Sequence, residues 1–333
     1  MRKVKWGVLG VAKIATEKVI PAMQQGEASE IVGLASRDVT KAGEAAKRLG
    51  VPRSYGSYED LLADPDIEAV YNPLPNELHA PWTVRALDAG KHVLCEKPVA
   101  LDAKEAETLI AARDRSGKLV AEAFMVRFHP QWRRAKELVE TGAIGPARAV
   151  QTFFCYRLLD PMNVRNIPPG GGGLYDIGCY AILTARYVFG AEPVRVAGVM
   201  DRDPNFGTDR LFSGLIEFPG ARHLTFTVGT QLAGHQRVTI MGEEGRIEIQ
   251  IPFNAPPDRP TKILIDSGVD LFGGGARMEE FPVCDQYALQ GDAFSRAILD
   301  KGSLPYPIED AIANMRVIDA LFRSARSGSW EKP

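Results

Sequence analysis

Three side chains that could take part in acid–base chemistry, Lys97, Asp176 and Tyr180, follow an apolar run or a run of glycines in this sequence. Lys97 follows, after Glu96, the carboxyl end of residues 92–95, an apolar run that is typical of a buried strand. Asp176 and Tyr180 follow four consecutive glycines at 170–173, and their spacing predicts that both lie on one side of a helix. If they converged, this ammonium, carboxylate and phenol would bind sugar hydroxyls and move a proton.

Each of these residues also has a purely structural interpretation. Lys97 precedes a proline and fits a surface lysine at the end of a strand. Asp176 fits a helix N-cap or a first-turn acid, which the free N–H groups of the helix would stabilise. Tyr180 fits a packed aromatic whose hydroxyl is bound by a neighbour. Beside an ammonium, however, Tyr180 would be suited to act as an acid or base.

A glycine-containing loop near the N-terminus is typical of a dinucleotide site. Gly10, Ala12 and Ala15 occupy the three positions of a relaxed G-x-G-x-x-A pattern between an apolar run and a helical pattern. We expect Gly10, Ala12, Lys13 and Ile14 to contact the cofactor, because the helix that follows offers its N–H groups to phosphates. Ala12 replaces the usual glycine, and a tight strand-to-helix turn without a ligand remains the alternative.

The end of the second expected strand favours NADP over NAD. An NAD site normally places an acid there to hold the ribose 2′-hydroxyl. This sequence has Ser36 and Arg37 instead, and Arg37 can pair with a 2′-phosphate as a planar fork while Ser36 donates a hydrogen bond. We add Lys41 to this phosphate site. The alternative is that Arg37 is a solvated surface residue and that Asp38 caps the next helix.

The elements that must position these residues alternate in type over the first 120 or so residues. Strands are expected at 4–9, 30–35, 67–72, 92–95 and 119–123, and helices at 14–25, 38–49, 57–63, 76–89 and 103–116. Strands separated by helices in this way indicate right-handed βαβ units and a parallel sheet. We therefore predict an α/β Rossmann domain over residues 1–123.

The remainder, 124–333, predicts an α+β domain with a large open, mainly antiparallel sheet, and its last helices could pack back on the Rossmann domain. Strands are expected at 147–156, 193–201, 210–218, 222–231, 236–241 and 245–251, and helices at 130–141, 176–189, 287–301 and 308–327. The proline-rich stretch 252–260 is interpreted as an exposed loop.

Composition excludes several classes of function. The formal net charge is −2, so a general attraction to nucleic acid or to an anionic membrane is not expected. Neither a secretory signal nor a run of ~20 apolar residues is recognisable, and we expect a cytoplasmic protein whose four cysteines are reduced and buried. The cysteine and histidine spacings fit no metal motif, so no metal is expected.

Taken together, these motifs resemble the Gfo/Idh/MocA oxidoreductases, and the resemblance spans nearly the whole chain. It rests on the loop at Gly10, Ala35-Ser36-Arg37-Asp38, the block Gly90-Lys91-His92-Val93-Leu94-Cys95-Glu96-Lys97-Pro98, and Asp176 with Tyr180 after the glycines. The segment Ala123-Phe124-Met125-Val126-Arg127-Phe128-His129-Pro130 and the tyrosine at 180 are similar to the glucose–fructose oxidoreductase, NADP-dependent D-xylose dehydrogenase and dimeric dihydrodiol dehydrogenase branch.

The resemblance implies roles for individual residues. Lys97 and Tyr180 take the family's catalytic positions, Asp176 takes its aspartate position, and Arg127 joins these three at the substrate. The residues that it implies near the cofactor are Asn72, Pro73, Asn76, His79, Glu96, Lys97 and Arg165. Val164 stands where a tryptophan commonly precedes the arginine, which leaves the shape of the sugar pocket open.

The function implied is an NADP(H)-dependent oxidoreductase that transfers a hydride between nicotinamide and a CH–OH or C=O carbon of a sugar or polyol. An aldose such as xylose or glucose is favoured, and a trans-dihydrodiol or an inositol is the alternative substrate. NAD is the less favoured cofactor. A homodimer or a dimer of dimers is implied, because one face of the second domain's sheet commonly forms a subunit interface. A non-catalytic NADP-binding regulator on the same fold is the alternative from another class.

Overall fold

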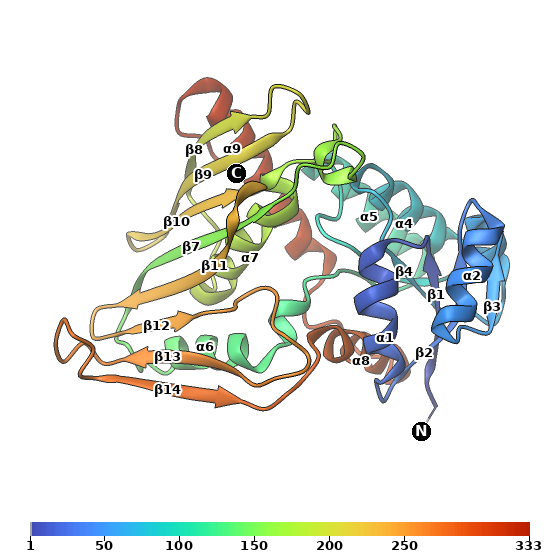
Figure 1. Cartoon of the computed structure of the whole chain (residues 1–333), viewed down its shortest axis with the longest axis horizontal. Helices are drawn as coiled ribbons and strands as arrows, with labels where there is room; N and C mark the ends of the chain where they lie inside the picture. The colour runs from blue at the N-terminus through green and yellow to red at the C-terminus, as the bar shows by residue number, and fades with distance from the viewer. Residues whose placement is uncertain (1) are drawn as a thin grey trace. The chain divides into compact units, whose positions relative to one another are not determined.

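The computed structural model describes residues 2–333, which form two compact units. The first unit consists of the described chain up to Met125 together with the later segment Asp285–Ile312. The second unit consists of Val126–Cys284 and Ala313–Pro333. The boundary expected from the sequence, 123/124, lies within two residues of the first change of unit. Each unit is built on one sheet (Figure 1).

The first unit contains a six-stranded parallel sheet with the order β3-β2-β1-β4-β5-β6, which confirms the predicted Rossmann architecture. Its strands are β1 (Val4–Leu9), β2 (Ser29–Ala35), β3 (Arg53–Tyr55), β4 (Ala69–Asn72), β5 (His92–Cys95) and β6 (Val120–Glu122). Its helices are α1 (Ile20–Gln24), α2 (Val39–Leu49), α3 (Tyr58–Ala63), α4 (His79–Asp88), α5 (Ala103–Ser116) and α8 (Gln286–Leu299). The strand order reverses between β1 and β4, where sheets of this kind bind their ligands.

Helix α8 completes the core of this unit although it comes from the far end of the sequence. The indole of Trp6 is fully buried, donates a hydrogen bond to Ser295 at 3.0 Å and packs against Phe294 at 5.4 Å between ring centroids. The carboxylate of Asp292 accepts the backbone N–H groups of Glu27 and Ala28, each at 2.9 Å. These contacts fasten α8 to β1 and to the start of β2.

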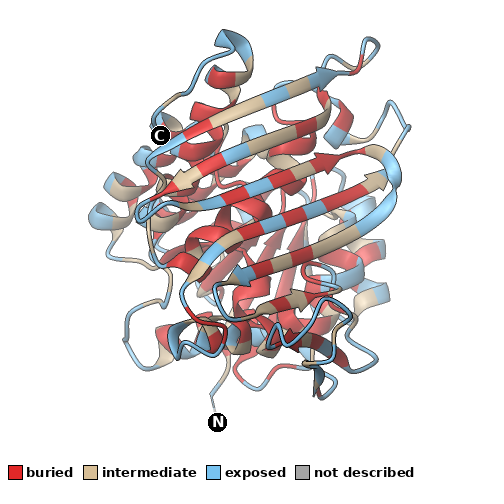
Figure 2. Cartoon of the chain, turned by 90° about the vertical axis from the view of Figure 1, so that its left-hand side faces the viewer, coloured by how far each residue is buried: buried red, intermediate tan, exposed pale blue. Residues whose placement is uncertain are grey.

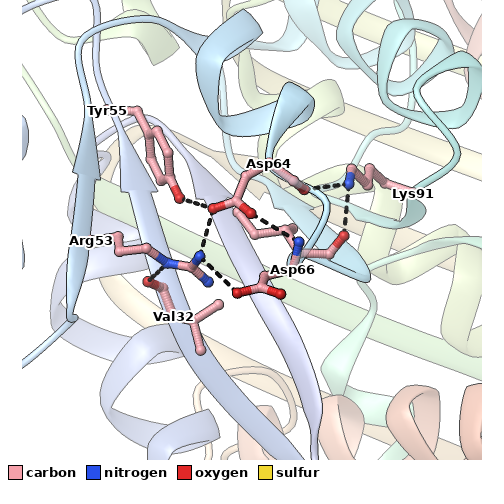
Figure 3. A network of polar contacts seen from close by, with 7 residues as sticks. Val32, Arg53, Tyr55, Asp64, Asp66 and Lys91 are labelled. Atoms are coloured by element: carbon pink, nitrogen blue, oxygen red, sulfur yellow. Dashed lines mark hydrogen bonds and ion pairs between the residues drawn. The ribbon is translucent and has the colours of Figure 1, made fainter.

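The short strand β3 was not predicted, because its three residues form no apolar run. A polar network holds it in place (Figure 3). The guanidinium of Arg53 donates to the Asp64 carboxylate at 2.7 Å, and the Tyr55 hydroxyl donates to the same carboxylate. Lys91 donates to the Asp64 carbonyl at 2.6 Å, and burial raises the pKa of Tyr55 to about 12. This edge strand is therefore fixed by side chains that lie well apart in the sequence.

The second unit contains an eight-stranded sheet with the order β14-β13-β12-β11-β7-β10-β9-β8. It is mainly antiparallel, as predicted, with a single parallel pair between β7 and β10. Its strands are β7 (Ala147–Arg157), β8 (Arg195–Arg202), β9 (Asp209–Phe218), β10 (Arg222–Gly229), β11 (Gln231–Gly242), β12 (Arg246–Ile249), β13 (Thr261–Asp266) and β14 (Ala276–Phe281). Its helices are α6 (Pro130–Glu140), α7 (Cys179–Phe189) and most of α9 (Ile308–Ser327).

The structure corrects three expectations in this unit. Strands β13 and β14 were missed. The stretch 252–260 is not simply an exposed loop, because the side chain of Phe253 is 1% exposed and stacks on Phe154 at 4.7 Å. Cys284 is only half-buried, whereas the other three cysteines are buried, and within residues 2–333 none of the four forms a disulfide. Along the strands of this sheet, buried and exposed residues alternate (Figure 2), which gives the sheet one packed face and one open face.

Candidate active site

The turn after β1 has the geometry that a pyrophosphate needs. Gly10 adopts a φ of +89°, and its N–H donates to the carbonyl of Ala35 at 2.8 Å. A Cβ at Gly10 would lie 3.1 Å from the Leu74 side chain, so the position favours glycine for both its conformation and its space. Ala12 and Ile14 are half-buried and Lys13 is exposed beside Glu17. The chain then enters a π-helical turn, residues Ala15–Val19.

The tip of β2 carries basic rather than acidic side chains. The carboxylate of Asp38 accepts the N–H groups of Thr40 and Lys41, so it caps α2, as the sequence suggested. Ser36 is buried, and its hydroxyl accepts the N–H of Asp38 at 3.2 Å. Arg37 and Lys41 are exposed, and neither side chain forms an ion pair with any residue in the described range 2–333. The tip therefore presents two uncommitted cations to solvent, which fits a 2′-phosphate.

The loop after β4 is built on buried polar groups. The amide of Asn72 donates to the His79 carbonyl at 3.0 Å and accepts the Leu74 N–H at 3.3 Å. The ring nitrogens of His79 lie 2.6 Å from the carbonyls of Pro98 and Leu74. Burial lowers the pKa of His79 to about 4, against the opposing effect of the two carbonyls. The side chains of Asn72 and His79 therefore form hydrogen bonds with the backbone. Of the other two residues expected near the cofactor in this loop, Pro73 is buried and Asn76 is half-buried.

His79 connects this loop to the turn that carries Lys97. Glu96 accepts the hydroxyl of Tyr71 at 2.6 Å on one oxygen and the N–H of Lys97 at 3.2 Å on the other. The Lys97–Pro98 peptide is cis, and the Pro98 carbonyl is the partner of His79. Lys97 itself is half-buried. The carboxyl ends of β1, β2, β4 and β5 thus carry Gly10, Ser36, Asn72 and Glu96 to one edge of the parallel sheet.

In the second unit the glycine run allows the backbone to pass close to other groups. Gly172 has a φ of +118°, and a Cβ there would lie 2.0 Å from a carboxylate oxygen of Asp209. Asp209 accepts the N–H of Leu174 at 2.6 Å, at the start of the π-helical turn Leu174–Gly178. Burial raises the pKa of Asp209 to about 7. The glycines thus let a buried acid cap the turn that carries Asp176.

Asp176 and Tyr180 differ in their surroundings. Asp176 is not the N-cap but does lie in the first turn of Leu174–Gly178, as the second structural interpretation expected. Its side chain is 13% exposed, pairs with the Arg165 guanidinium at 3.0 Å and accepts the Tyr156 hydroxyl. Tyr180 is buried in α7, with its ring against Phe154 and Phe253. Arg127 is also buried, in the short 3₁₀ helix Met125–Phe128. That these residues act with Lys97, which belongs to the other unit, stays a prediction.

Sequence reasoning missed two residues of this group, Tyr156 and Asp209. Tyr156 is the last residue of the expected strand 147–156, so it was seen only as a strand residue. Asp209 lies one residue before the expected strand 210–218 and opens β9 in the structure, so it was assigned no role. No motif linked them to the glycine run, because their partners are 20 and 35 residues away in the sequence. Among residues 2–333 no cluster of three metal-ligating side chains occurs, and no helix is long and apolar enough to cross a membrane.

Family comparisons match both units. Residues 4–124 match the family described as "Oxidoreductase family, NAD-binding Rossmann fold", and residues 132–248 match the "GFO/IDH/MocA C-terminal domain". The two matches together cover more than half of the chain. The fold and the candidate site therefore define an oxidoreductase with an NAD-binding Rossmann unit, and the chain belongs to the Gfo/Idh/MocA family.

Some of the relatives with named activities carry the names of sugars. The chain is 49% identical to an uncharacterised oxidoreductase, ORF334, of Rhizobium meliloti over 99% of both chains. It is 37% identical to D-xylose 1-dehydrogenase (NADP(+)) 2 of Haloferax volcanii, over 97% of this chain and 98% of the relative. Among solved structures, an aldose–aldose oxidoreductase from Caulobacter crescentus superposes with a TM-score of 0.91 at 30% identity over all of both chains.

Proposed function

We propose that this protein is an NADP(H)-dependent oxidoreductase that transfers a hydride between nicotinamide and a CH–OH or C=O carbon of an aldose or related sugar. The observation that carries the proposal is the tip of β2, where Asp38 is committed to capping and Arg37 and Lys41 are exposed without an ion-pair partner among residues 2–333. An arginine fork suits a 2′-phosphate, and no free acid is placed to prefer the 2′-hydroxyl of NAD.

Each residue proposed to lie around the reacting carbon has a separate role. A bound nicotinamide supplies the site that accepts or returns the hydride. During oxidation a phenolate at Tyr180 accepts the hydroxyl proton, and during reduction the phenol returns it to the oxygen. Lys97 donates a hydrogen bond to the same oxygen and stabilises the charge that develops on it. Asp176 accepts a hydrogen bond from a neighbouring hydroxyl, and Arg127 belongs to the same substrate site.

The relatives support this choice of cofactor and substrate. The Haloferax volcanii relative is named as an NADP(+) D-xylose dehydrogenase, and a 3-ketoreductase from Actinomadura kijaniata, 30% identical, was solved with NADP. Variants of that ketoreductase with a substituted lysine or tyrosine have also been solved. Lysine and tyrosine are the residue types of Lys97 and Tyr180 in this proposal.

One other substrate class has specific support, and one other class of protein remains as an alternative. Trans-1,2-dihydrobenzene-1,2-diol dehydrogenase of Mus musculus is 31% identical over 74% of both chains, so a cyclic diol is the second candidate substrate, ahead of an inositol. A non-catalytic NADP-binding regulator is the candidate of another class. It has no use for Lys97, Asp176 and Tyr180 together, which is why we place it last.

One experiment separates these candidates. Reduced-cofactor formation is followed with NADP⁺ and with NAD⁺ against D-xylose, D-glucose, myo-inositol and a trans-dihydrodiol. We expect turnover of an aldose with NADP⁺ preferred. Turnover of the dihydrodiol alone would establish the second candidate, and tight NADPH binding without turnover in either direction would favour the regulator.

A further inference from the structure

The carboxylate of Asp176 is held by two donors that belong to different segments of the second unit. The hydroxyl of Tyr156, near the end of β7, donates to one carboxylate oxygen. The Nε of Arg165, from the turn that precedes the glycine run, donates to the other oxygen at 3.0 Å. Asp176 is mostly buried, whereas Arg165 is 44% exposed, so the pair is open to solvent on the arginine side.

Two donors on a carboxylate have a defined chemical effect. Hydrogen bonds to the charged form of an acid, and a nearby cation, both favour that charged form. These two contacts favour the ionised form of Asp176, and an ionised carboxylate only accepts hydrogen bonds. It is thus suited to receive hydroxyl hydrogens and unsuited to donate a proton to the substrate.

Tyr156, in contrast to Asp176, is held in its protonated form. Burial, together with the negative charge of Asp176, raises the pKa of Tyr156 well above its ordinary value. The buried carboxylate of Asp209 adds to the same effect, and Arg165 opposes it. The phenol consequently keeps its proton near neutral pH and acts as a fixed donor. Of Tyr156 and Tyr180, only Tyr180 then remains for proton transfer.

We infer that Tyr156 and Arg165 are positioning residues that hold Asp176 as an oriented, ionised acceptor for a hydroxyl next to the reacting carbon of a sugar. This inference rests on the proposed function. It gives Arg165 a role that acts through Asp176 rather than through the cofactor, unlike the role that the resemblance implied. It also makes a vicinal hydroxyl part of the substrate class.

The first test is a kinetic cycle with Tyr156→Phe, Asp176→Asn and the double variant, assayed with an aldose and with its 2-deoxy analogue. Losing one hydrogen bond to a charged group should lower kcat/KM for the aldose by about tenfold or more. In the Asp176→Asn background the same change should cost less than about twofold, because the acceptor charge is already gone. Preference for the aldose over its deoxy analogue should shrink in Tyr156→Phe.

A pH profile gives a readout that a merely structural role would not move. Without the Tyr156 donor the ionised form of Asp176 is less favoured, so the acid limb of kcat/KM should move to higher pH. Arg165 on the turn and Asp209 on β9 are the other charged groups of this cluster and are unchanged in the variant. Tyr187→Phe, on the same helix as Tyr180, is the matched control, since the Lys136 contact with its ring is kept.

The variant Arg165→Lys tests whether Arg165 acts through Asp176 or through the cofactor. NADPH affinity, measured by fluorescence titration, should stay within about twofold of wild type while kcat/KM for the aldose falls. A weakened NADPH affinity with an unchanged sugar KM would place Arg165 at the cofactor and overturn its positioning role. Additive effects in the Tyr156–Asp176 cycle, or an unmoved pH profile, would overturn the inference for Tyr156. A wild-type protein without sugar turnover would instead overturn the proposed function itself.

Discussion

The N–H of Lys41 donates to the carboxylate of Asp38 at 3.1 Å, which commits the acid beyond the tip of β2 to the first turn of α2. An acid that caps a helix through its side chain is held in place there, and the N–H groups of Thr40 and Lys41 both bind the same oxygen of Asp38, Oδ1. The neighbouring Arg37 extends into solvent. The proposed preference for NADP therefore depends on the capping arrangement of Asp38 and on the exposed Arg37 beside it.

This arrangement predicts the effect of Arg37→Gln. Losing a charge-assisted, forked contact with a phosphate should raise the Kd of NADP⁺ by about tenfold or more, whereas the Kd of NAD⁺ should hardly change. Isothermal titration with both cofactors checks this. Arg48→Gln, an exposed residue at the other end of α2, is the control. Equal losses for the two cofactors would show that Arg37 does not read the 2′-phosphate.

Local sequence patterns predicted some elements to the residue. The strands Val4–Leu9 and His92–Cys95 and the helix Ala103–Ser116 have the expected bounds, because each is a short buried run or a periodic pattern next to Gly or Asp. The strand Arg53–Tyr55 was missed because its stability comes from Asp64 rather than from burial. Strand β14 was missed because it is mostly exposed.

In the candidate site, too, residues within local motifs could be predicted from the sequence, whereas contacts between distant residues could not. Gly10, Lys97 and Tyr180 stand out in the sequence because their neighbours form motifs. The pairing of Tyr156 with Asp176 and of Asp209 with Leu174 is set by how β7 and β9 lie against the π-helical turn, and no periodicity along the chain encodes it. Residues that hold other residues in place were therefore the ones that sequence reasoning could not find.

Lys97→Ala should separate chemistry from cofactor binding. Removing a hydrogen-bond donor and charge from the reacting oxygen should lower kcat by ~10²-fold or more, and NADPH affinity should be nearly unchanged. Steady-state kinetics and fluorescence titration give the two values. Lys104→Ala, on the exposed surface of α5, is the matched control. Near-normal turnover in Lys97→Ala would remove Lys97 from the mechanism.

Gly172→Ala should destabilise the second unit. The φ of +118° disfavours any L side chain, and the new Cβ would lie 2.0 Å from Asp209 Oδ1. We expect a loss of at least about 1–3 kcal/mol from backbone strain alone. Thermal unfolding measures it, with Gly234→Ala as the control, because no atom lies within 4 Å of a Cβ there. Equal melting temperatures for the two variants would contradict the role of Gly172.

The open face of the eight-stranded sheet predicts an interface between copies of this chain, as family membership implies. Val199 on β8 is 75% exposed, and Leu215 on β9 and Phe153 on β7 are also exposed on strands of this sheet. Val199→Lys combined with Leu215→Lys should convert a dimer into a monomer by placing charges in an apolar contact. Light scattering after gel filtration reports the mass. Val269→Lys, on the β13–β14 loop, should leave it unchanged, and a monomeric wild type would refute the prediction.

The buried carboxylate of Asp209 predicts a pH dependence of stability with a defined sign. Burial raises its pKa to about 7 in the folded protein, from an ordinary value of 3.8. The folded state therefore binds the proton more tightly, so the contribution of Asp209 to stability is greatest at low pH and falls as the pH rises from about 4 to about 7. Asp209→Asn removes this titration.

The melting temperature of Asp209→Asn relative to wild type should consequently be higher at pH 8 than at pH 5. A difference of about 1 kcal/mol would correspond to roughly 2–4 °C for a domain of this size. The asparagine oxygen can still accept the Leu174 N–H, so the cap on the π-helical turn is retained. A relative melting temperature that is the same at pH 5 and pH 8 would mean that the N–H groups around Asp209 outweigh its burial, because an acid that is ionised in both the folded and the unfolded protein adds no pH dependence in this range.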